Sequence, residues 1–322
     1  MNRRFLSFVI LATTIFAGNV WADDGGNCGP VGKESDCTWS YNSETNTLTI
    51  SGTGSGEMAD YNGYSTTPWK DYRTSATKVV VEEGIKNIGK TAFHYMSNVT
   101  SLSVPDSLTS IGQNAFAGMS SVTGKFEIPK NVTTIGQGAF YDMSSVTGEL
   151  IIPNSVTNIG NYAFHNMTSV TSLVIPESII SIGNNAFQNM PSLINITIPD
   201  TVTNINYQAF WSTTTQNLNT NAENLQRYLN AGGGFKNGDL NITCSSGDCK
   251  AILEAWDVAH NTTYASRAII TAKSQQVHNA DGSTSVYENG QLVATRGKRI
   301  YTVEEASKLS KETGNTFKLR YK

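Results

Sequence analysis

The four cysteines are the residues whose types and spacing most directly suggest chemistry in this sequence. They form two close pairs, Cys28 with Cys37 and Cys244 with Cys249, nine and five residues apart. Thiols in an exported chain oxidise to disulfides, whereas four thiolates in a reducing compartment could close a zinc site. Spacing and the export signal described below favour two local disulfides over zinc, although the sequence alone permits three pairings.

Histidines and glutamates are the other groups that could do chemistry. His94 and His165 occupy the same position of a repeated unit, three units apart, and hence lie ~15 Å apart at strand spacing. That distance is too long for a shared metal ion. Glu127 and Glu149 resemble the carboxylate pair of a glycosidase, but Lys125 aligns with Glu149, so a cross-strand salt bridge is the plainer interpretation.

The sequence therefore predicts no catalytic residue, no cofactor and no metal site, and it contains neither a Gly-x-Ser-x-Gly elbow nor a phosphate-binding loop. The formal net charge is −3, from 23 basic and 26 acidic residues. A chain with this balance has no general attraction to nucleic acid or to anionic lipid. The lack of a catalytic constellation favours a binding or structural protein over an enzyme.

An export signal is predicted for residues 1–22. Arg3 and Arg4 form a basic start, an apolar stretch runs from Phe5 to Ala17, and small residues end at Ala22. The apolar run is too short to span a bilayer, so a cleaved signal peptide is favoured over a membrane anchor. The mature chain would begin at Asp23, carry no transmembrane segment, and be secreted or held at the cell surface.

The elements that position these groups belong to a repeat of the form Ile-Gly-x-x-Ala-Phe, present in six copies of which the last is degraded. Its phenylalanines are 23 or 24 residues apart, at positions 93, 116, 140, 164, 187 and 210. A fixed period in this range predicts a solenoid, in which each unit buries its apolar face against its neighbours.

One unit can be interpreted residue by residue. Leu102 and Val104 alternate with polar residues, which predicts a short strand ended by Pro105. Gly112 allows a tight corner, and Ala115 and Phe116 have the spacing of a helical turn that covers the core. The methionines three residues after each Phe could form a soft-metal or promiscuous surface, but their spacing favours core filling. The predicted strands, one parallel sheet in all, are 78–81, 102–104, 126–128, 150–152, 173–175 and 196–198.

The outward positions of these strands form the candidate binding face. They are mostly small or polar and mixed in charge, which suits a protein or glycan partner. The residues are Lys78, Val80, Ser101, Ser103, Lys125, Glu127, Glu149, Ile151, Ser172, Val174, Asn195 and Thr197.

The chain is predicted to divide into a signal peptide (1–22), an N-terminal β cap (23–77), about six repeats (78–211), a divergent C-terminal cap (212–275) and a small C-terminal module (276–322). The first cap should contain strands 39–41 and 47–50. Its aromatic residues Tyr61, Tyr64, Trp69 and Tyr72 either stack on sugars or, preferably, shield the first repeat. The second cap should contain helices 221–230 and 249–260 around strand 240–244. The last module should contain a hairpin at Asn289-Gly290, a helix 302–310 and a strand 316–322.

The repeat Val-x-x-Leu-x-Ile-Pro-x-Ser-Val-Thr-x-Ile-Gly-x-x-Ala-Phe resembles the BspA-like class of bacterial leucine-rich repeats over residues 78–211. The segment from Cys37 to Gly54, with Pro68-Trp69, is similar to the one that commonly precedes such repeats. This chain carries Met where the family has Cys after the Phe, which leaves the fold undisturbed. The resemblance implies a right-handed leucine-rich-repeat solenoid in an exported protein that adheres to host matrix proteins or to other microbes.

Two classes of function follow. The first is a non-enzymatic surface or secreted protein that binds a protein or glycan on a host or microbial surface. The alternatives are a structural component of the envelope or an assembly and, less favoured, a hydrolase module within residues 212–322. A pull-down against host matrix proteins and bacterial glycans would discriminate between them.

Overall fold

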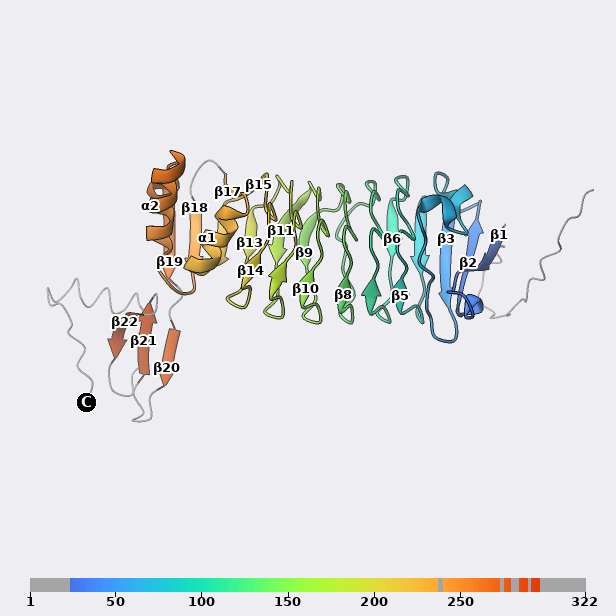
Figure 1. Cartoon of the computed structure of the whole chain (residues 1–322), viewed down its shortest axis with the longest axis horizontal. Helices are drawn as coiled ribbons and strands as arrows, with labels where there is room; N and C mark the ends of the chain where they lie inside the picture. The colour runs from blue at the N-terminus through green and yellow to red at the C-terminus, as the bar shows by residue number, and fades with distance from the viewer. Residues whose placement is uncertain (1–23, 237–239, 273–274, 279–283, 289–290, 296–322) are drawn as a thin grey trace, which may run out of the picture.

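The structure is a computed structural model that describes residues 24–236, 240–272, 275–278, 284–288 and 291–295. The described residues up to 272 form an elongated solenoid whose rungs stack along its long axis, and those from 275 to 295 form a separate three-stranded sheet (Figure 1). The predicted signal peptide, the helix 302–310 and the strand 316–322 lie outside the described residues. The predicted solenoid is confirmed.

The N-terminal cap is a small antiparallel sheet joined to the first repeat. Strands β1 (Asp24–Asn27), β2 (Cys37–Asn42) and β3 (Thr47–Gly52) pair in order, and β3 then runs parallel to β4 (Lys78–Val81). The short 3₁₀ segments η1 (Glu34–Asp36), η2 (Tyr64–Thr66) and η3 (Lys70–Tyr72) connect them. The β2–β3 hairpin confirms the predicted strands, whereas β1 was not predicted.

The predicted aromatic shield is confirmed for the residues that meet the first repeat. Trp69 is buried, its ring stacks on Phe93 with centroids 5.5 Å apart, and its Nε1 donates to the carbonyl of Ala92 at 2.9 Å. Tyr61 is also buried, with its ring edge toward Trp69. Tyr64, by contrast, is exposed. The cap therefore closes the open end of the core, which a repeat array requires.

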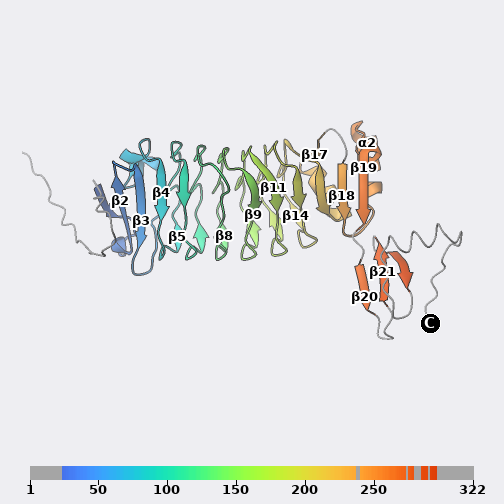
Figure 2. The same cartoon turned by 180° about the vertical axis from the view of Figure 1, so that it is seen from behind.

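The repeat strands lie side by side in a parallel arrangement along the solenoid (Figure 2). Strand β4 pairs with β6 (Ser101–Ser103). Further along, one sheet contains β9 (Gly148–Ile151), β11 (Val170–Val174), β13 (Asn195–Thr197), β16 (Asn217–Thr220), β18 (Leu240–Cys244) and β19 (Ala268–Ala272). The sheet thus extends three strands past the predicted end of the repeats.

The prediction of one continuous sheet is wrong at the third unit, because residues 126–128 form no strand. That unit carries an extra residue, Gly124, whose φ is +81° and which makes only an isolated bridge to Val146. Gly148 occupies the same position of the next unit with a φ of +83° and begins β9, so the inserted glycine alone does not explain the missing strand. Phe126 and Ile128 nevertheless point into the core and are buried.

A second parallel sheet, which the sequence analysis missed, is built from two-residue strands at the Ile-Gly corners. Its members are β5 (Asn87–Ile88), β7 (Ser110–Ile111), β8 (Thr134–Ile135), β10 (Asn158–Ile159), β12 (Ser181–Ile182) and β14 (Asn204–Ile205). The glycine that follows allows successive rungs to approach closely. A Cβ atom at Gly112 would lie 2.8 Å from the carbonyl oxygen of Ile88.

The third side of each rung is the turn that carries the phenylalanine. Single i→i+3 bonds, such as Met96 N–H to Phe93 carbonyl, confirm short helical turns. The turns do not lengthen into helices, because the residues two before and two after each Phe take left-handed φ values, +54° at Thr91 and +59° at Tyr95. The Phe93 N–H instead donates to the carbonyl of Ala115 on the next rung at 2.8 Å.

The core is a column of stacked phenylalanine rings. Successive centroids from Phe93 to Phe210 lie 5.3, 5.4, 5.6 or 5.7 Å apart, at interplanar angles of 19° or less. The stack ends at Trp69 on one side and at Tyr228 on the other. The methionine column is fully buried beside it, which confirms the core-filling interpretation.

The C-terminal cap uses helices in place of the short turns. The structure contains α1 (Ala222–Asn230), α2 (Cys249–His260) and α3 (Tyr264–Arg267), with β15 (Thr213–Thr215) paired to β17 (Gly233–Phe235). Both predicted helices and strand 240–244 are confirmed.

The predicted hairpin of the C-terminal module is also confirmed, as β21 (Thr284–Glu288) and β22 (Gln291–Thr295). A further strand, β20 (Gln275–His278), pairs with β21.

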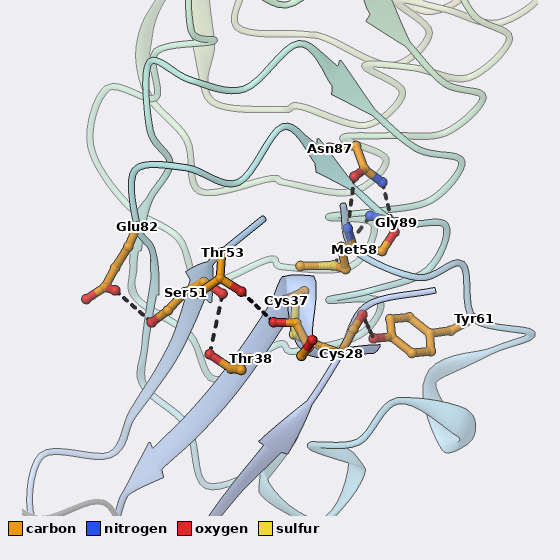
Figure 3. The surroundings of a disulfide bond; sticks show 11 residues. Cys28, Cys37, Thr38, Ser51, Thr53, Met58, Tyr61, Glu82, Asn87 and Gly89 are labelled. Atoms are coloured by element: carbon orange, nitrogen blue, oxygen red, sulfur yellow. Dashed lines mark hydrogen bonds between the residues drawn. A yellow bond between two sulfur atoms is a disulfide. The ribbon is translucent and has the colours of Figure 1, made fainter. Parts of the chain in front are cut away.

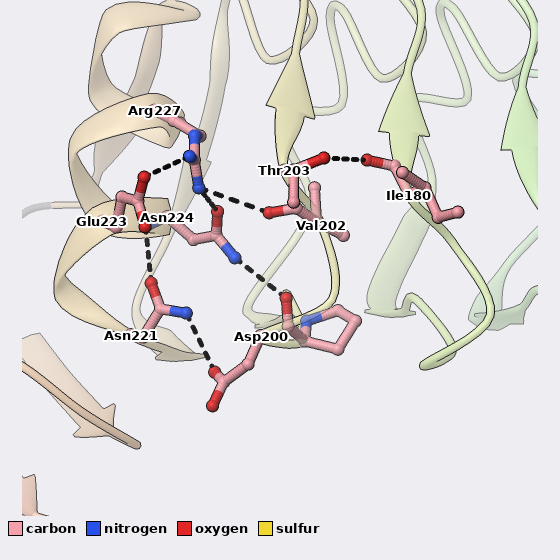
Figure 4. A network of polar contacts seen from close by, with 9 residues as sticks. Ile180, Asp200, Val202, Thr203, Asn221, Glu223, Asn224 and Arg227 are labelled. Carbon is pink, nitrogen blue, oxygen red and sulfur yellow. Dashed lines mark hydrogen bonds and ion pairs between the residues drawn. The ribbon is translucent and has the colours of Figure 1, made fainter.

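A buried polar network fastens α1 to the last repeat (Figure 4). Asn221 accepts from the Asn224 N–H at 2.7 Å as the N-cap and donates to Asp200 at 3.0 Å. Asn224 is fully buried and donates to the carbonyl of Pro199 at 2.9 Å, while Arg227 donates to Asn224 at 2.7 Å. The helix therefore seals the open end of the core with its polar groups satisfied.

The structure joins both cysteine pairs as disulfides. Cys28 bonds to Cys37 and Cys244 to Cys249, with Cα atoms 4.8 and 6.3 Å apart. The first bond sits where the cap meets the first rung (Figure 3), and the carbonyl of Cys28 accepts from the Ala59 N–H at 2.9 Å and from the Tyr61 hydroxyl at 3.3 Å. The second bond holds the end of β18 to the start of α2.

We predict that Phe140→Ala lowers the free energy of unfolding by ~3–5 kcal/mol, because the variant leaves a cavity between two stacked rings. Tyr207→Ala is the control, since Tyr207 is 70% exposed and surface truncations cost about 0.5 kcal/mol or less. Urea denaturation followed by far-UV circular dichroism measures both. Equal midpoints for the two variants would refute the inward register of the phenylalanines.

We predict that replacing Cys28 and Cys37 together by Ser costs ~2–3 kcal/mol of stability, because a short loop in the cap is released in the unfolded chain. Non-reducing peptide mapping of the unaltered chain should recover the two local pairs. A peptide that joins Cys37 to Cys244, or four free thiols, would contradict the pairing.

Candidate binding face

The candidate binding face is the outward side of the strands that precede each proline. In its C-terminal part the ladder register places the outward residues in two columns. The first column contains Glu149, Ser172, Asn195, Asn217 and Asn241. The second contains Ile151, Val174, Thr197, Asn219 and Thr243.

The first column forms an amide ladder along the solenoid axis. Asn217 Nδ2 donates to Asn195 Oδ1 at 2.6 Å, and Asn241 Nδ2 donates to Asn217 Oδ1 at 2.8 Å. Each amide retains a second N–H and further acceptor capacity. The inward neighbours, such as Leu173 and Ile196, are fully buried, so the core holds the ladder in place.

The N-terminal part of the face is separate. Lys78 pairs with Ser101 and Val80 with Ser103 between β4 and β6, and the third rung interrupts the ladder beyond them. The structure thus brings ten outward positions into two groups and leaves Lys125 and Glu127 on the interrupting rung. All of the predicted outward side chains are exposed or half-buried.

The expected salt bridge between Lys125 and Glu149 is replaced by another. Lys125 Nζ lies 2.9 Å from Glu127 Oε1 on its own rung. The pKa of Lys125 is raised, mainly by this hydrogen bond and further by the negative charges of Glu127 and, more weakly, Glu149. The reason is the register break, because residues 125–128 do not enter the ladder that would align them with β9.

Sequence reasoning missed the outward residues of β16 and included none from β18. The signal was present: Leu218 follows Ile196 by 22 residues and precedes Ile242 by 24. The strand spacing therefore continues near the repeat period although the Ile-Gly-x-x-Ala-Phe phrase stops. Following the strand residues, and not the phenylalanines, would have found the β16 rung. Strand 240–244 was predicted, but its outward residues were not assigned to the binding face.

The two repeat histidines are half-buried and lie on the turn side, away from the strand face. Burial is the main cause that lowers the pKa of His94, and the positive charge of the nearby Arg73 lowers it further. Burial also lowers the pKa of His165, although Gln188 and Asp142 act in the opposite direction. The Nδ1 atoms of both rings are buried without a hydrogen-bond partner in the described structure.

Within the described residues, no group of three or more His, Cys, Asp or Glu side chains is arranged to hold a metal ion. Over the same residues, no helix has the length and apolar character needed to cross a membrane.

Comparison with known families finds the BspA type leucine rich repeat region in six copies, over residues 72–166 and 146–232. The two ranges together span half of the chain. The chain belongs to the BspA-type leucine-rich repeat family. Comparison with curated proteins finds no match.

Several solved structures are similar to this BspA-type protein. A leucine-rich repeat protein from Eubacterium ventriosum shares 23% identity over 69% of this chain and 67% of its own, with a TM-score of 0.47. A leucine rich cell surface protein from Faecalibacterium prausnitzii shares 24% identity over 57% of this chain and 53% of its own, with a TM-score of 0.43. The Treponema pallidum leucine-rich repeat protein shares 20% identity over 55% of this chain and 86% of its own, also with a TM-score of 0.43.

We predict that the BspA-type solenoid loses thermal stability as the pH falls below about 6.5. The folded-state pKa values of His94 and His165 are lowered, so in this range the unfolded chain binds more protons than the folded chain. The variant His94→Gln/His165→Gln, which copies Gln188 in the same repeat position, should show a smaller fall in Tm.

The measurement is differential scanning calorimetry of both proteins between about pH 7.5 and pH 5.5. Glu34 and Asp36, whose pKa values are lowered from 4.5 and 3.8, respond only at lower pH and do not interfere. The same pH dependence in the double variant and in the unaltered protein would contradict the assignment.

Proposed function

We propose that this BspA-type protein is an exported, non-enzymatic binding protein that contacts a protein or glycan on a host or microbial surface through the strand face. The observation that carries the proposal is the pair of outward columns from Glu149 to Thr243. Most of these side chains are small and polar, all are exposed or half-buried over a buried core, and the hydrogen bonds of the amide ladder join outward side chains to one another.

Several features support export and adhesion. The predicted signal peptide directs the chain out of the cytoplasm, and the two disulfides suit an oxidising compartment. A wide surface built by many rungs permits recognition in which a few contacts dominate. The strand face combines charged and neutral groups, since the Lys125–Glu127 ion pair and the neutral amides lie on the same side of the solenoid.

A structural role for residues 212–272 is supported by the rungs, helices and polar network found there, and this favours a binding solenoid over a hydrolase module. A role in envelope structure or assembly is the alternative function. It predicts self-association or wall attachment in place of a soluble partner.

The experiment is a binding screen of the purified chain against immobilised host matrix proteins and bacterial cell-surface glycans, followed by two matched variants. Asn195→Arg/Asn241→Arg places bulky charge on the strand face. Thr134→Arg/Asn158→Arg places the same charge on exposed positions of the second sheet.

We expect the strand-face variant to weaken the captured interaction about tenfold or more. The second-sheet variant should bind normally, and both should retain the unaltered Tm because exposed substitutions change stability little. Equal binding by both variants would reject the strand face. Loss of binding on deletion of residues 276–322 alone would assign the interaction to the C-terminal module.

A further inference from the structure

Exposed aromatic residues gather on a different side of the solenoid from the strand face. We define the turn face as the outward positions of residues 89–96, 112–119, 136–143, 160–167, 183–190 and 206–213, with Tyr64 beside the first. In the part of the chain that the structure describes, the exposed aromatic residues are Tyr64, Tyr95, Tyr162, Tyr207 and Trp211. All of them lie on the turn face.

Two of these tyrosines occupy backbone positions that disfavour them. Tyr95 and Tyr162 have φ values of +59° and +57°, in the left-handed region where bulky residues are uncommon. The same two positions in the other rungs hold mainly residues that tolerate this conformation: Asn114, Gly118, Gly138, Asp142, Asn166, Asn185 and Asn189. Tyr95 and Tyr162 are 46% and 38% exposed and do not belong to the hydrophobic core, so core packing does not explain their type and a function outside folding is indicated.

The rings at the two ends of the turn face are held in place. Tyr95 lies over Gly118 of the next rung, where a Cβ atom would come within 2.4 Å of its ring. Trp211 lies over Gly232 in the same way, at 2.9 Å. Tyr95 also stacks on His94 with centroids 4.1 Å apart. Aromatic platforms that are already ordered lose little conformational entropy on binding.

A third aromatic group lies between them. The rings of Tyr141 and His165 stack on adjacent rungs at 4.7 Å and 6°, and Tyr162 is tilted beside them at 5.9 Å. Aromatic groups are therefore found on the first rung, on the third and fourth rungs, and on the sixth. The second rung has the small residues Ala117 and Gly118 at these positions, so no aromatic ring projects from it between the first two groups.

The groups beside the rings are neutral amides. Asn189 Nδ2 donates to Asn166 Oδ1 at 2.5 Å, and Asn166 donates at 2.5 Å to Asp142, so that a polar ladder runs along the row. Asn185 donates to Gln188 at 2.5 Å. From the second to the sixth rung, Asp142 is the single charged residue among the outward positions of these turns. The first rung differs, because its turn carries Lys90, and Arg73 lies 4.5 Å from the centroid of the Tyr64 ring and donates to the carbonyl of Tyr95 at 3.1 Å. Between Tyr95 and Trp211 the row therefore offers a charged ligand little complementary charge.

The arrangement of the aromatic groups suits an extended polymer. An extended chain laid along the solenoid axis passes the aromatic groups of the first, of the third and fourth, and of the sixth rung in turn. The C–H face of a pyranose is complementary to the negative face of an aromatic ring, and its hydroxyl groups match amide donors and acceptors.

We propose that the turn face binds an uncharged, extended polysaccharide along the solenoid axis. Tyr95, Tyr162 and Trp211 stack on sugar rings, and the amide ladder hydrogen-bonds their hydroxyl groups. This site is distinct from the strand face and does not depend on it.

The test uses substitutions that the repeat itself supplies. Tyr95→Asn and Tyr162→Asn restore the residue found at these positions in other rungs, and Trp211→Gln copies Gln188. The control variant, Ile180→Thr/Ile194→Thr, removes two exposed apolar side chains elsewhere and follows the same logic, since Thr157 and Thr171 hold the matching positions. Ile180 and Ile194 are 54% and 38% exposed.

Affinity electrophoresis and isothermal titration calorimetry are run with soluble mixed-linkage β-glucan, glucomannan and xylan, and with hyaluronan as the charged comparison. We expect the unaltered chain to bind at least one neutral polymer, each single variant to weaken that binding about fivefold, and the triple variant to abolish it. The Tm of the tyrosine variants should stay equal or rise, because strain is relieved. Trp211→Tyr should retain binding.

Several outcomes would overturn the proposal. They are the failure of all three neutral polymers to bind, a preference for hyaluronan, and unchanged affinity in the triple variant. An equal loss in the Ile180→Thr/Ile194→Thr control would also overturn it. Loss of a protein partner, with no polysaccharide bound, would make the turn face a protein interface instead. None of these results bears on the strand-face variants, so the two sites are tested separately.

Discussion

The stack of phenylalanine rings along the axis is the interaction on which the rest of the structure depends. Each ring from Phe93 to Phe187 has a ring on both faces, so no rung can complete its core alone. The backbone obeys the same rule, because the N–H of a turn phenylalanine donates to a carbonyl of the following rung. Both requirements fail at an open end, which explains why Trp69 closes one end and Tyr228, on a capped helix, closes the other.

This dependence separates folding from recognition. The inward positions are fixed in type, with Ile, Ala, Phe and Met repeated through the rungs, and they satisfy the core without help from outward side chains. The outward positions can therefore change from rung to rung at little cost in stability. Two surfaces use that freedom differently: the strand face carries polar ladders and an ion pair, whereas the turn face carries aromatic rings between neutral amides.

The sequence predicted the solenoid, the cap hairpin and both C-terminal helices, because the 23–24 residue period and the apolar alternation are local and strong. It failed at the third unit, where residues 126–128 form no strand and Lys125 pairs with Glu127 on its own rung. The inserted Gly124 does not distinguish this unit, because Gly148 occupies the same position of the next unit and begins β9. It also missed the two-residue strands at the Ile-Gly corners, which are too short for any alternation to show. The outward direction of the strand residues was predictable, while the aromatic row was not, because its members are scattered over several repeat positions and meet only when the rungs stack.

The left-handed positions show how far a repeat sequence can be interpreted once its structure is known. Where Asn, Gly or Asp occupies such a position, the residue satisfies the backbone and needs no further explanation. Tyr95 and Tyr162 are bulkier than these residues, and neither belongs to the hydrophobic core. Tyr95 also relies on Gly118 one rung away, since any side chain there would displace its ring. Gly118 is explained by its own left-handed φ of +76°, so it is the type of the two tyrosines, and not the glycine, that the fold alone does not explain.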